Sequence, residues 1–282
     1  MLNARRRIAS LRTFLAGRQR LFTGIALLAA LGGCLALGGW PLRLLLLGVV
    51  LSGLLEVYRL FWPGRRKPLL KGCGLLCGGG MILGQAFSPA WPLFFLTLGF
   101  AAAAMSFLSD YGRGNPFARI QDHSLLVFGL LYIPLLIVLA LPLSRAEQIL
   151  IIAAAVVSDT AAYYVGINFG RHKIWPSVSP KKSWEGSAGG LAACALLCLL
   201  AGALAPAKGL PALPLWGWLC LGLFLNLAAQ AGDFFESALK RSAEVKDAGG
   251  LLPGHGGILD RLDSILFVIP AYLLARALAG AP

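Results

Sequence analysis

Residues able to do chemistry gather in one stretch near the end of the chain, residues 233–263, which lies between two long apolar runs. Six of the chain's twelve acidic residues fall there, interleaved with four basic ones: Asp233, Glu236, Glu244, Asp247, Asp260 and Asp263 with Lys240, Arg241, Lys246 and Arg261. A Pro-Gly-His-Gly-Gly turn that includes His255 spans residues 253–257. Carboxylates bind hard cations, and Lys and Arg bind phosphate oxygens. The stretch therefore predicts a site for metal-bound phosphates.

The spacing of the acidic residues predicts that they meet. Asp260 and Asp263 are three residues apart, as are Asp233 and Glu236, so each pair shares a helix face. Where the two helix ends lie together, the carboxylates repel one another, and a divalent cation relieves this repulsion. We expect Asp233, Asp260 and Asp263 to bind Mg²⁺. The sequence leaves open whether a second cation binds beside it. The helix dipole alone would explain acids in a first turn, but not Asp233 and Glu236, which we expect at a helix C-terminus.

A basic loop before a later apolar run, residues 171–186, is the second candidate region. Its candidate phosphate-binding residues are Ser179, Lys181, Lys182 and Ser183. A basic, hydroxyl-bearing loop at the start of a helix can bind phosphate, although its composition alone favours a plain cytoplasmic anchor. Gly256 and Gly257 lead into the last apolar run, and we expect exposed amides there to suit a phosphate as well.

Two acidic residues lie inside apolar runs, where a charge is costly and is usually functional or paired. Asp159 is roughly 16 Å from the cytoplasmic end of its span at helical rise, so we expect it to face the bundle or a wet cavity. Glu56 lies about 8 Å inside its span, and both a role in the site and pairing with a neighbour such as Arg59 stay open. The three glycines at 78–80 predict a crowded helix crossing or a local break.

Composition predicts an all-α polytopic membrane protein. Hydrophobic residues make up 58% and charged residues 13% of the 282 residues, and the apolar runs reach the roughly 20 residues that cross a bilayer. We expect about nine transmembrane helices, at residues 21–38, 41–61, 68–87, 90–108, 123–143, 148–169, 187–205, 212–236 and 259–279. We interpret residues 1–282 as one integral membrane domain, with mainly scaffold spans in 1–145 and catalytic spans in 146–282.

The distribution of charge predicts the orientation of the chain. Of the 25 Lys and Arg residues, only Arg43, Arg145, Lys208 and Arg276 fall on one side of the nine spans. Cytoplasmic loops carry the basic excess, so we expect a cytoplasmic N-terminus and an outside C-terminus. We also expect a multi-pass protein of the cell inner (plasma) membrane whose active site faces the cytoplasm. The same distribution excludes nucleic acid, which a net charge of +13 would otherwise suggest as a partner.

These residues resemble the signature of one family, phosphatidate cytidylyltransferase, also called CDP-diacylglycerol synthase. The matching residues follow in the family's order and spacing: Ser237-x-Leu239-Lys240-Arg241, then Lys246-Asp247-x-Gly249, then Leu252-Pro253-x-His255-Gly256-Gly257-Ile258-x-Asp260-Arg261-Leu262, closing on Asp263. Earlier runs of the family resemble residues 159–163, 166–170 and 179–186. Ile167 departs from the family, which commonly has a basic residue there, and the departure removes one phosphate contact.

The resemblance implies transfer of a cytidylyl group from CTP to phosphatidate in the bilayer, with release of pyrophosphate, at a Mg²⁺-dependent site. It implies catalytic roles for Asp233, Lys240, Arg241, Lys246, Asp247, His255, Asp260, Arg261 and Asp263, and substrate binding by Ser179, Lys181, Lys182, Ser183, Ser237, Gly256 and Gly257. The sequence leaves open whether the protein forms a homodimer. One alternative is a related CTP-dependent polyprenol or phytol kinase. A cation-coupled transporter would also use intramembrane acids, but most acids here gather at the ends of spans.

Overall fold

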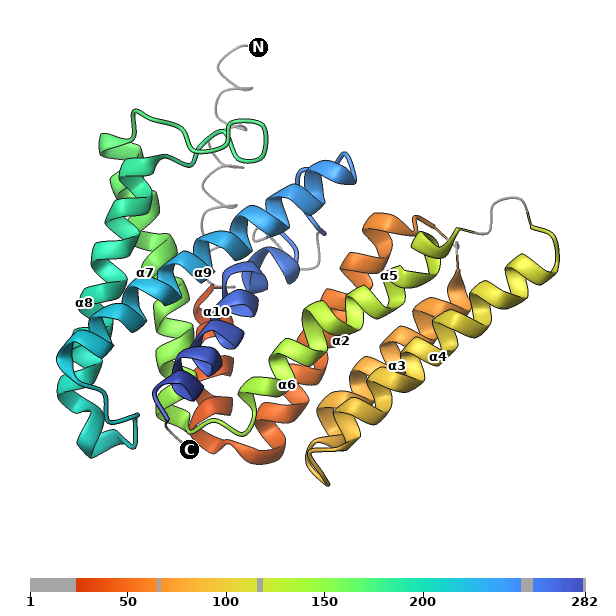
Figure 1. Cartoon of the computed structure of the whole chain (residues 1–282), viewed down its shortest axis with the longest axis horizontal. Coiled ribbons are helices and arrows are strands. Elements are labelled where there is room, and N and C mark those ends of the chain that lie inside the picture. Colours follow the sequence, from red (N-terminus) through yellow and green to blue (C-terminus); the bar gives the residue numbers. More distant parts are fainter. Residues whose placement is uncertain (1–23, 65–66, 116–118, 250–255, 281–282) are drawn as a thin grey trace, which may run out of the picture.

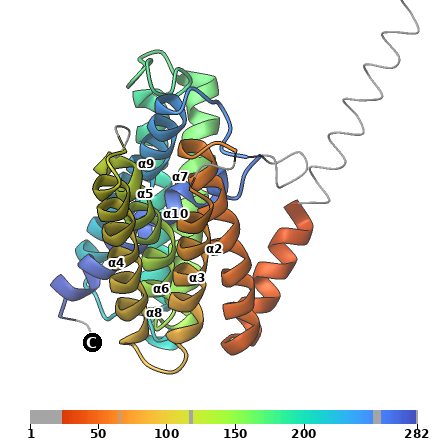
Figure 2. The ribbon, with the colours of Figure 1, turned by 90° about the vertical axis from the view of Figure 1, so that its right-hand side faces the viewer.

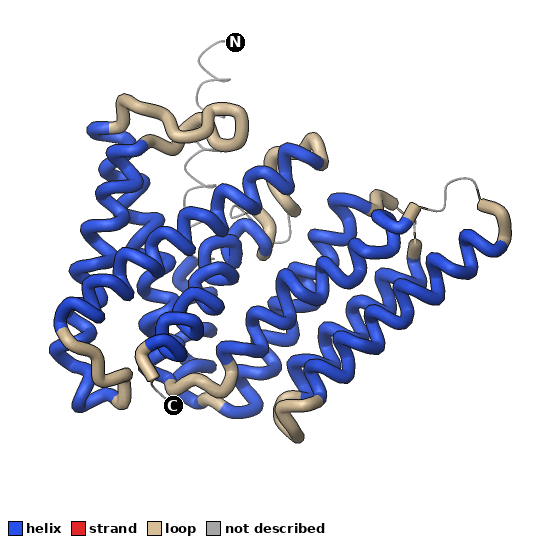
Figure 3. Tube along the Cα trace, in the orientation of Figure 1, coloured by secondary structure: helices blue, strands red, loops and turns tan. Residues whose placement is uncertain are grey.

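The computed structural model of the chain describes residues 24–64, 67–115, 119–249 and 256–280. Within these ranges the chain consists of helices joined by loops (Figure 3). The exceptions among the described residues are Lys173 and Ser183, which pair in an isolated β-bridge, and the bridge residue Gly256. The helices are therefore the elements that position every candidate site residue.

Nine helical segments lie in the part of the chain that the structure describes. They are Gly24–Leu37, α2 (Gly39–Phe61), α3 (Pro68–Gly84), α4 (Trp91–Gly112), the continuous segment α5 (Ile120–Leu130), η1 (Leu131–Leu135) and α6 (Leu136–Ala140), α7 (Arg145–Phe169), α8 (Trp184–Lys208), α9 (Leu215–Ser242) and α10 (Leu259–Leu278). Six of these segments are long and apolar enough to cross a membrane: α2, α4, α5–α6, α7, α8 and α9. The predicted all-α polytopic membrane fold is confirmed.

The connections between helices alternate between the two ends of the bundle (Figure 1). The loops that precede α3, α5, α8 and α10 lie at one end, and those that precede α4, α7 and α9 lie at the other end. This arrangement agrees with the two sides that the distribution of Lys and Arg predicts for these loops. The loop into α8, the last turns of α9 and the start of α10 together hold most of the candidate site residues, and they share one end of the molecule.

The buried side chains form two clusters that share α10. The first cluster is built on α2, α3 and α5–α6 and includes Leu259 and Leu266 of α10. The second is built on α7, α8 and α9 and includes Val268 and Tyr272 of α10. Figure 1 shows α10 between α9 on one side and α2 and α6 on the other. Figure 2 shows the helix Gly24–Leu37 at the edge of the bundle, next to α2.

Small residues let the helices of the first cluster approach closely. A Cβ added at Gly74 in α3 or at Gly129 in α5 would lie 2.6 Å from a carbon of the Tyr58 ring, so glycine is needed on both sides of this ring. A Cβ at Gly78 would lie 2.5 Å from Leu54 of α2. Because α3 continues through residues 78–80 without interruption, a crowded crossing, and not a local break, accounts for the three glycines.

The helix α9 extends further than the sequence predicts. Its span is expected to end at residue 236, but the helix continues to Ser242. Asp233 and Glu236 therefore lie inside the helix, and the expectation that they lie at its C-terminus is wrong. Lys240 and Arg241 form the last turn, where the helix dipole favours cations. The charges that seem to end the span in sequence are instead compatible with a longer helix.

Candidate functional site

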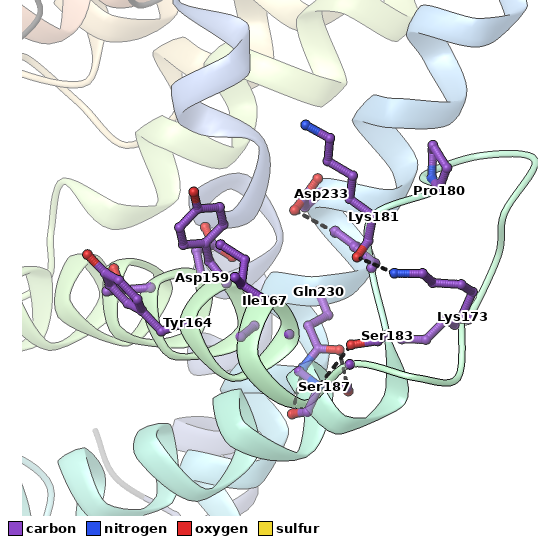
Figure 4. A pocket seen from close by; sticks show the side chains of 18 of the residues that line it. Asp159, Tyr164, Ile167, Lys173, Pro180, Lys181, Ser183, Ser187, Gln230 and Asp233 are labelled. Atoms are coloured by element: carbon purple, nitrogen blue, oxygen red, sulfur yellow. Dashed lines mark hydrogen bonds and ion pairs between the residues drawn. The ribbon is translucent and has the colours of Figure 1, made fainter. Parts of the chain in front are cut away.

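A cavity of about 960 Å³ opens between α7, α8, α9, α10 and the loop that joins α7 to α8. Figure 4 shows the side chains from these elements that surround it. The charged residues of its lining are Asp159, Lys173, Lys181, Lys182, Asp233, Asp260 and Asp263. Four carboxylates and three lysines thus line one space. The structure places the three predicted metal ligands and the predicted basic loop at the same cavity.

A close helix crossing brings two of the carboxylates together. A Cβ added at Gly232 of α9 would overlap the backbone carbonyl oxygen of Asp263 and would lie 3.2 Å from Phe267 Cβ, so α9 and α10 touch there. Asp233 follows this glycine directly. Asp263 accordingly interacts electrostatically with Asp233, and also with Asp159 of α7. The glycine at 232 is therefore one of the residues that position the site.

Two of the cavity carboxylates are paired with lysines. Lys182 Nζ lies 2.5 Å from Asp233 Oδ2. Lys240 Nζ donates to Asp260 Oδ1 at 2.7 Å and also pairs with Glu236. Glu236 is fully buried and is not part of the cavity lining. The i, i+3 spacing of Asp233 and Glu236 therefore does not place both carboxylates in the site, because only Asp233 faces the cavity.

The loop between α7 and α8 is fixed by contacts of its own. The bridge between Lys173 and Ser183 closes it. Ser183 is 3% exposed and caps α8, because its Oγ accepts from Gly186 N at 3.2 Å. The Trp175 ring packs edge-on against Phe234 of α9, with ring centres 5.0 Å apart. The loop is thus docked onto α9, which holds its lysines at the cavity.

The amides that open α10 are already bound to carboxylates. Gly257 N donates to Asp260 Oδ2 at 2.8 Å, and the amides of Ile258 and Leu259 donate to Glu56 at 3.0 and 2.8 Å. The expectation that the Gly257 amide is exposed and available to a phosphate is therefore wrong. Of the two alternatives for Glu56, pairing is observed, but its partners are backbone amides of α10 and not a basic neighbour on its own helix.

Some cavity residues were not predicted as site residues. Asp159, noted in the sequence only for its depth in an apolar span, accepts from Ser264 Oγ at 2.8 Å and lines the cavity. Ser187 Oγ donates to Gln230 Oε1 at 2.5 Å, which joins α8 to α9 at the cavity wall (Figure 4). Gln230 precedes Asp233 by three residues, and this helical spacing could have indicated it. No sequence signal points to Ser187.

Other predicted site residues do not line the cavity. Those that the structure describes are Ser179, Ser237, Lys240, Arg241, Lys246, Asp247, Gly256, Gly257 and Arg261. Ser237 and Lys240 lie one contact away from it, since Ser237 Oγ is 3.4 Å from Asp233 Oδ1 and Lys240 holds Asp260. Arg241, Lys246 and Asp247 are exposed. Gly256 has a φ of +80°, a conformation that favours glycine. His255 lies outside the described residues.

Arg261 lies at a different cavity. This second cavity has a volume of about 300 Å³ and lies between the helix Gly24–Leu37, α2, α6, α7 and the first half of α10. Its lining is almost wholly aliphatic, apart from Arg261 and Gln148. Asp260 and Arg261 are neighbours in sequence but face separate spaces, because consecutive residues of a helix point about 100° apart.

The donor chemistry of the main cavity fits Mg²⁺. Its four carboxylates offer hard oxygen ligands, and Mg²⁺ usually combines one or two protein carboxylates with waters and substrate phosphates. In the described part of the chain, no three His, Cys, Asp or Glu side chains form a group that could hold a metal by themselves. The residues therefore suit a cation that arrives with phosphate oxygens better than one enclosed by protein ligands alone.

Comparison with known proteins places these features in a family. The chain is 47% identical to phosphatidate cytidylyltransferase of Bacillus subtilis over 121 residues, which is 43% of this chain and 44% of that protein. It is 38% identical to phosphatidate cytidylyltransferase of Mycobacterium bovis over 160 residues, 55% of this chain and 51% of that protein. The corresponding values for phosphatidate cytidylyltransferase of Staphylococcus aureus strain COL are 47% over 115 residues, 40% of this chain and 42% of that protein.

These matches therefore span about half the length of the curated relatives. The model of the cytidylyltransferase family, by contrast, matches residues 18–278, which is nearly all of the chain. The predicted resemblance is confirmed by both comparisons, and this chain belongs to the cytidylyltransferase family.

Proposed function

We propose that this protein transfers a cytidylyl group from CTP to phosphatidate and forms CDP-diacylglycerol and pyrophosphate. The observation that carries the proposal is the meeting of four carboxylates and three lysines at one cavity of the helical bundle. A triphosphate with a divalent cation requires both signs of charge, and this cavity offers both. Membership of the cytidylyltransferase family and the names of the similar proteins support the choice of reaction.

The reaction requires little proton transfer. A phosphate oxygen of phosphatidate forms a bond to the α-phosphorus of CTP, while the bond from that phosphorus to the bridging oxygen breaks and pyrophosphate leaves. Because the nucleophile is already an anion, catalysis consists mainly of positioning and of neutralising charge. Lys173 and Lys181 are exposed lysines of the cavity lining, so they are suited to bind phosphate oxygens of the nucleotide.

The carboxylates would hold the cation. Asp233, Asp260 and Asp263 are the residues we assign to Mg²⁺, which when bound neutralises phosphate charge as a Lewis acid. Lys182 and Lys240 fix the side chains of Asp233 and Asp260 through ion pairs. Asp159 adds a fourth carboxylate, held by Ser264. The chain's own contribution is thus a set of acidic side chains whose positions are determined by basic and hydroxyl neighbours.

We also propose that the cavity faces the cytoplasm and that the protein lies in the cell inner (plasma) membrane. The cavity belongs to the end of the bundle where the loops into α3, α5, α8 and α10 lie. Those loops are the ones that carry the basic excess, and basic loops remain in the cytoplasm. A soluble nucleotide would then reach the cavity from the cytoplasm, and the lipid would reach it from the bilayer.

The test uses purified full-length protein in detergent with phosphatidate, Mg²⁺ and CTP labelled at either the α- or the γ-phosphorus. The α-label is expected to enter the lipid while one pyrophosphate is released for each lipid product, and EDTA is expected to abolish the transfer. Entry of the γ-label into the lipid would identify a CTP-dependent kinase and would overturn the proposal. Mg²⁺-independent transfer would contradict the assignment of the carboxylates while leaving the cytidylyl transfer intact.

A further inference from the structure

A side chain from the first helix cluster caps the helix that carries the acidic residues of the site. Glu56 of α2 is only 1% exposed, although it is a carboxylate inside a membrane helix. Its two oxygens accept from the backbone amides of Ile258 and Leu259 at 3.0 and 2.8 Å. The first amides of a helix have no partner within the helix, and α10 has no side-chain cap of its own at Ile258. Glu56 therefore supplies this cap from another element.

Two glycines of the family signature are packed against the same carboxylate. A Cβ added at Gly249 would lie 2.5 Å from Glu56 Oε1, and one added at Gly257 would lie 2.6 Å from Glu56 Oε2. Real Cβ atoms do not approach an oxygen so closely, so both positions require glycine as long as Glu56 stays in place. The carboxylate is thus held between the segment that follows α9 and the segment that begins α10.

The backbone amides at the start of α10 connect Glu56 to the cavity. Gly257 N, the amide immediately before the two that bind Glu56, donates to Asp260 Oδ2 at 2.8 Å. Glu56 and Asp260 together therefore satisfy three consecutive amides at the start of α10. Asp263 follows one turn later, and both aspartates line the cavity. Any shift of this first turn would move the two carboxylates relative to Asp233 on α9.

We propose that Glu56 is a positioning residue of the site: it fixes the first turn of α10 and through it the directions of Asp260 and Asp263. The inference rests on the proposed function for its effect on Mg²⁺, but its structural part stands on the contacts alone. Glu56 itself does not line the cavity, so it is not a catalytic residue. Its effect should appear as weaker cation binding and not merely as lower stability.

The chain offers a matched control. Glu147 is also buried, at 4% exposure, and also caps a helix, because it forms a capping box with Ser144 at the start of α7. It accepts from Tyr272 Oη at 2.9 Å near the other end of α10. Glu147 does not line the cavity. Replacing Glu147 by Gln therefore disturbs a second buried capping carboxylate that contacts α10, while leaving the first turn of α10 alone.

The experiment compares Glu56→Gln and Glu147→Gln in the full-length protein. A glutamine accepts from one amide but presents its NH₂ group to the other, so Glu56→Gln should speed hydrogen exchange in the peptide 256–264 at least tenfold. It should also weaken Mn²⁺ binding, followed by electron paramagnetic resonance, at least tenfold and raise the Mg²⁺ concentration for half-maximal turnover similarly. Glu147→Gln should change each of these quantities less than twofold, whatever its effect on Tm.

Each outcome decides the proposal. Unchanged exchange in Glu56→Gln would show that the cap does not hold the first turn, and faster exchange with unchanged Mn²⁺ binding would reduce Glu56 to a structural role. A wild-type protein that makes no CDP-diacylglycerol would sink the proposed function, while exchange and Mn²⁺ binding would still test the positioning. If Glu56→Gln does not insert, Gly249→Ala, which presses a methyl group against the same carboxylate, should give the same three shifts.

Discussion

The acidic residues of the cavity differ in what surrounds them. Asp260 is held by Lys240 and by the Gly257 amide, whereas Asp263 lies against the close crossing of α9 and α10. Asp260→Asn and Asp263→Asn keep the shape of the side chain and remove its charge. We expect each to lower turnover by at least a hundredfold, because metal clamping supplies several kcal/mol of transition-state stabilisation. The measurement is Mg²⁺-dependent CDP-diacylglycerol formation by correctly inserted protein.

Asp122→Asn is the control for these variants. Asp122 is an exposed acid in the first turn of α5, so it shares the favourable helix-dipole position of Asp260 but lies outside the cavity. If the dipole explains Asp260 and Asp263, all three variants should lose about 0.3–1 kcal/mol of stability and keep their activity. Turnover near the wild-type value in both Asp260→Asn and Asp263→Asn would contradict the metal assignment.

For single residues, the sequence predicts which residue types belong to the site better than it predicts which residues contact one another. The spacing of Asp233, Asp260 and Asp263 and their family resemblance were sufficient to expect them in one place. Glu56 could not be assigned, because its partners are more than 200 residues away in the chain and are backbone amides. Arg241 and Lys246 were expected in the site and are exposed outside it, since spacing alone does not tell which way a helix end or a loop turns.

The helix α9 shows why hydropathy misplaces the end of a membrane span. Its first part is apolar, and its last turns carry charges that would normally mark a loop. The helix continues because Lys240 binds two carboxylates, one on α9 and one on α10, and because cations suit a last turn. These tertiary contacts are not visible in hydropathy, so the existence of the element was predictable from sequence while its end was not.

The close crossing of α9 and α10 can be tested by substituting the glycine at their contact. In Gly232→Ala the new methyl group would meet the Asp263 carbonyl, so the two helices must separate. Overpacking of this kind typically costs about 1–3 kcal/mol, and here it would also move Asp233 away from Asp263. We expect a lower Tm and a loss of turnover larger than the loss of folded protein, measured on the same detergent preparation.

Gly48→Ala provides the comparison for this variant. Gly48 lies in α2 with nothing within 4 Å of an added Cβ, and alanine is favoured over glycine in a helix by roughly 1 kcal/mol. Gly48→Ala should therefore retain full activity and at least the wild-type Tm. Equal activity in Gly232→Ala and Gly48→Ala would show that the crossing does not set the geometry of the site.

For the whole molecule, hydropathy predicted where helical segments lie but not how they pack. About nine transmembrane helices were expected; helical segments occupy all nine regions within the described residues, and six of them are long and apolar enough to cross a membrane. The sharing of α10 by two clusters was not predictable, because both faces of an apolar helix look alike in sequence. The division into scaffold and catalytic halves remains a prediction, and the contact of Glu56 with α10 joins the two halves.

Orientation in the membrane is the property of the whole chain that can be tested most directly. In a protein lacking its six native cysteines, a cysteine placed at position 208 should react with an impermeant maleimide added to intact cells. A cysteine placed at position 181, beside the cavity, should react only after the membrane is opened, because basic loops stay in the cytoplasm. Labelling of position 181 from outside intact cells would overturn the proposed orientation.

Glu56 and its partners on α10 also determine the order in which the protein can assemble. They are 202 and 203 residues apart, so at roughly 5–20 residues per second the ribosome makes α10 on the order of 10–40 s after α2. During this interval the carboxylate lacks the amides that satisfy it, and such a group in a membrane helix is drawn toward water. Its burial must await the synthesis of the first turn of α10. Completion of the site thus requires that the chain has been synthesised and inserted as far as α10.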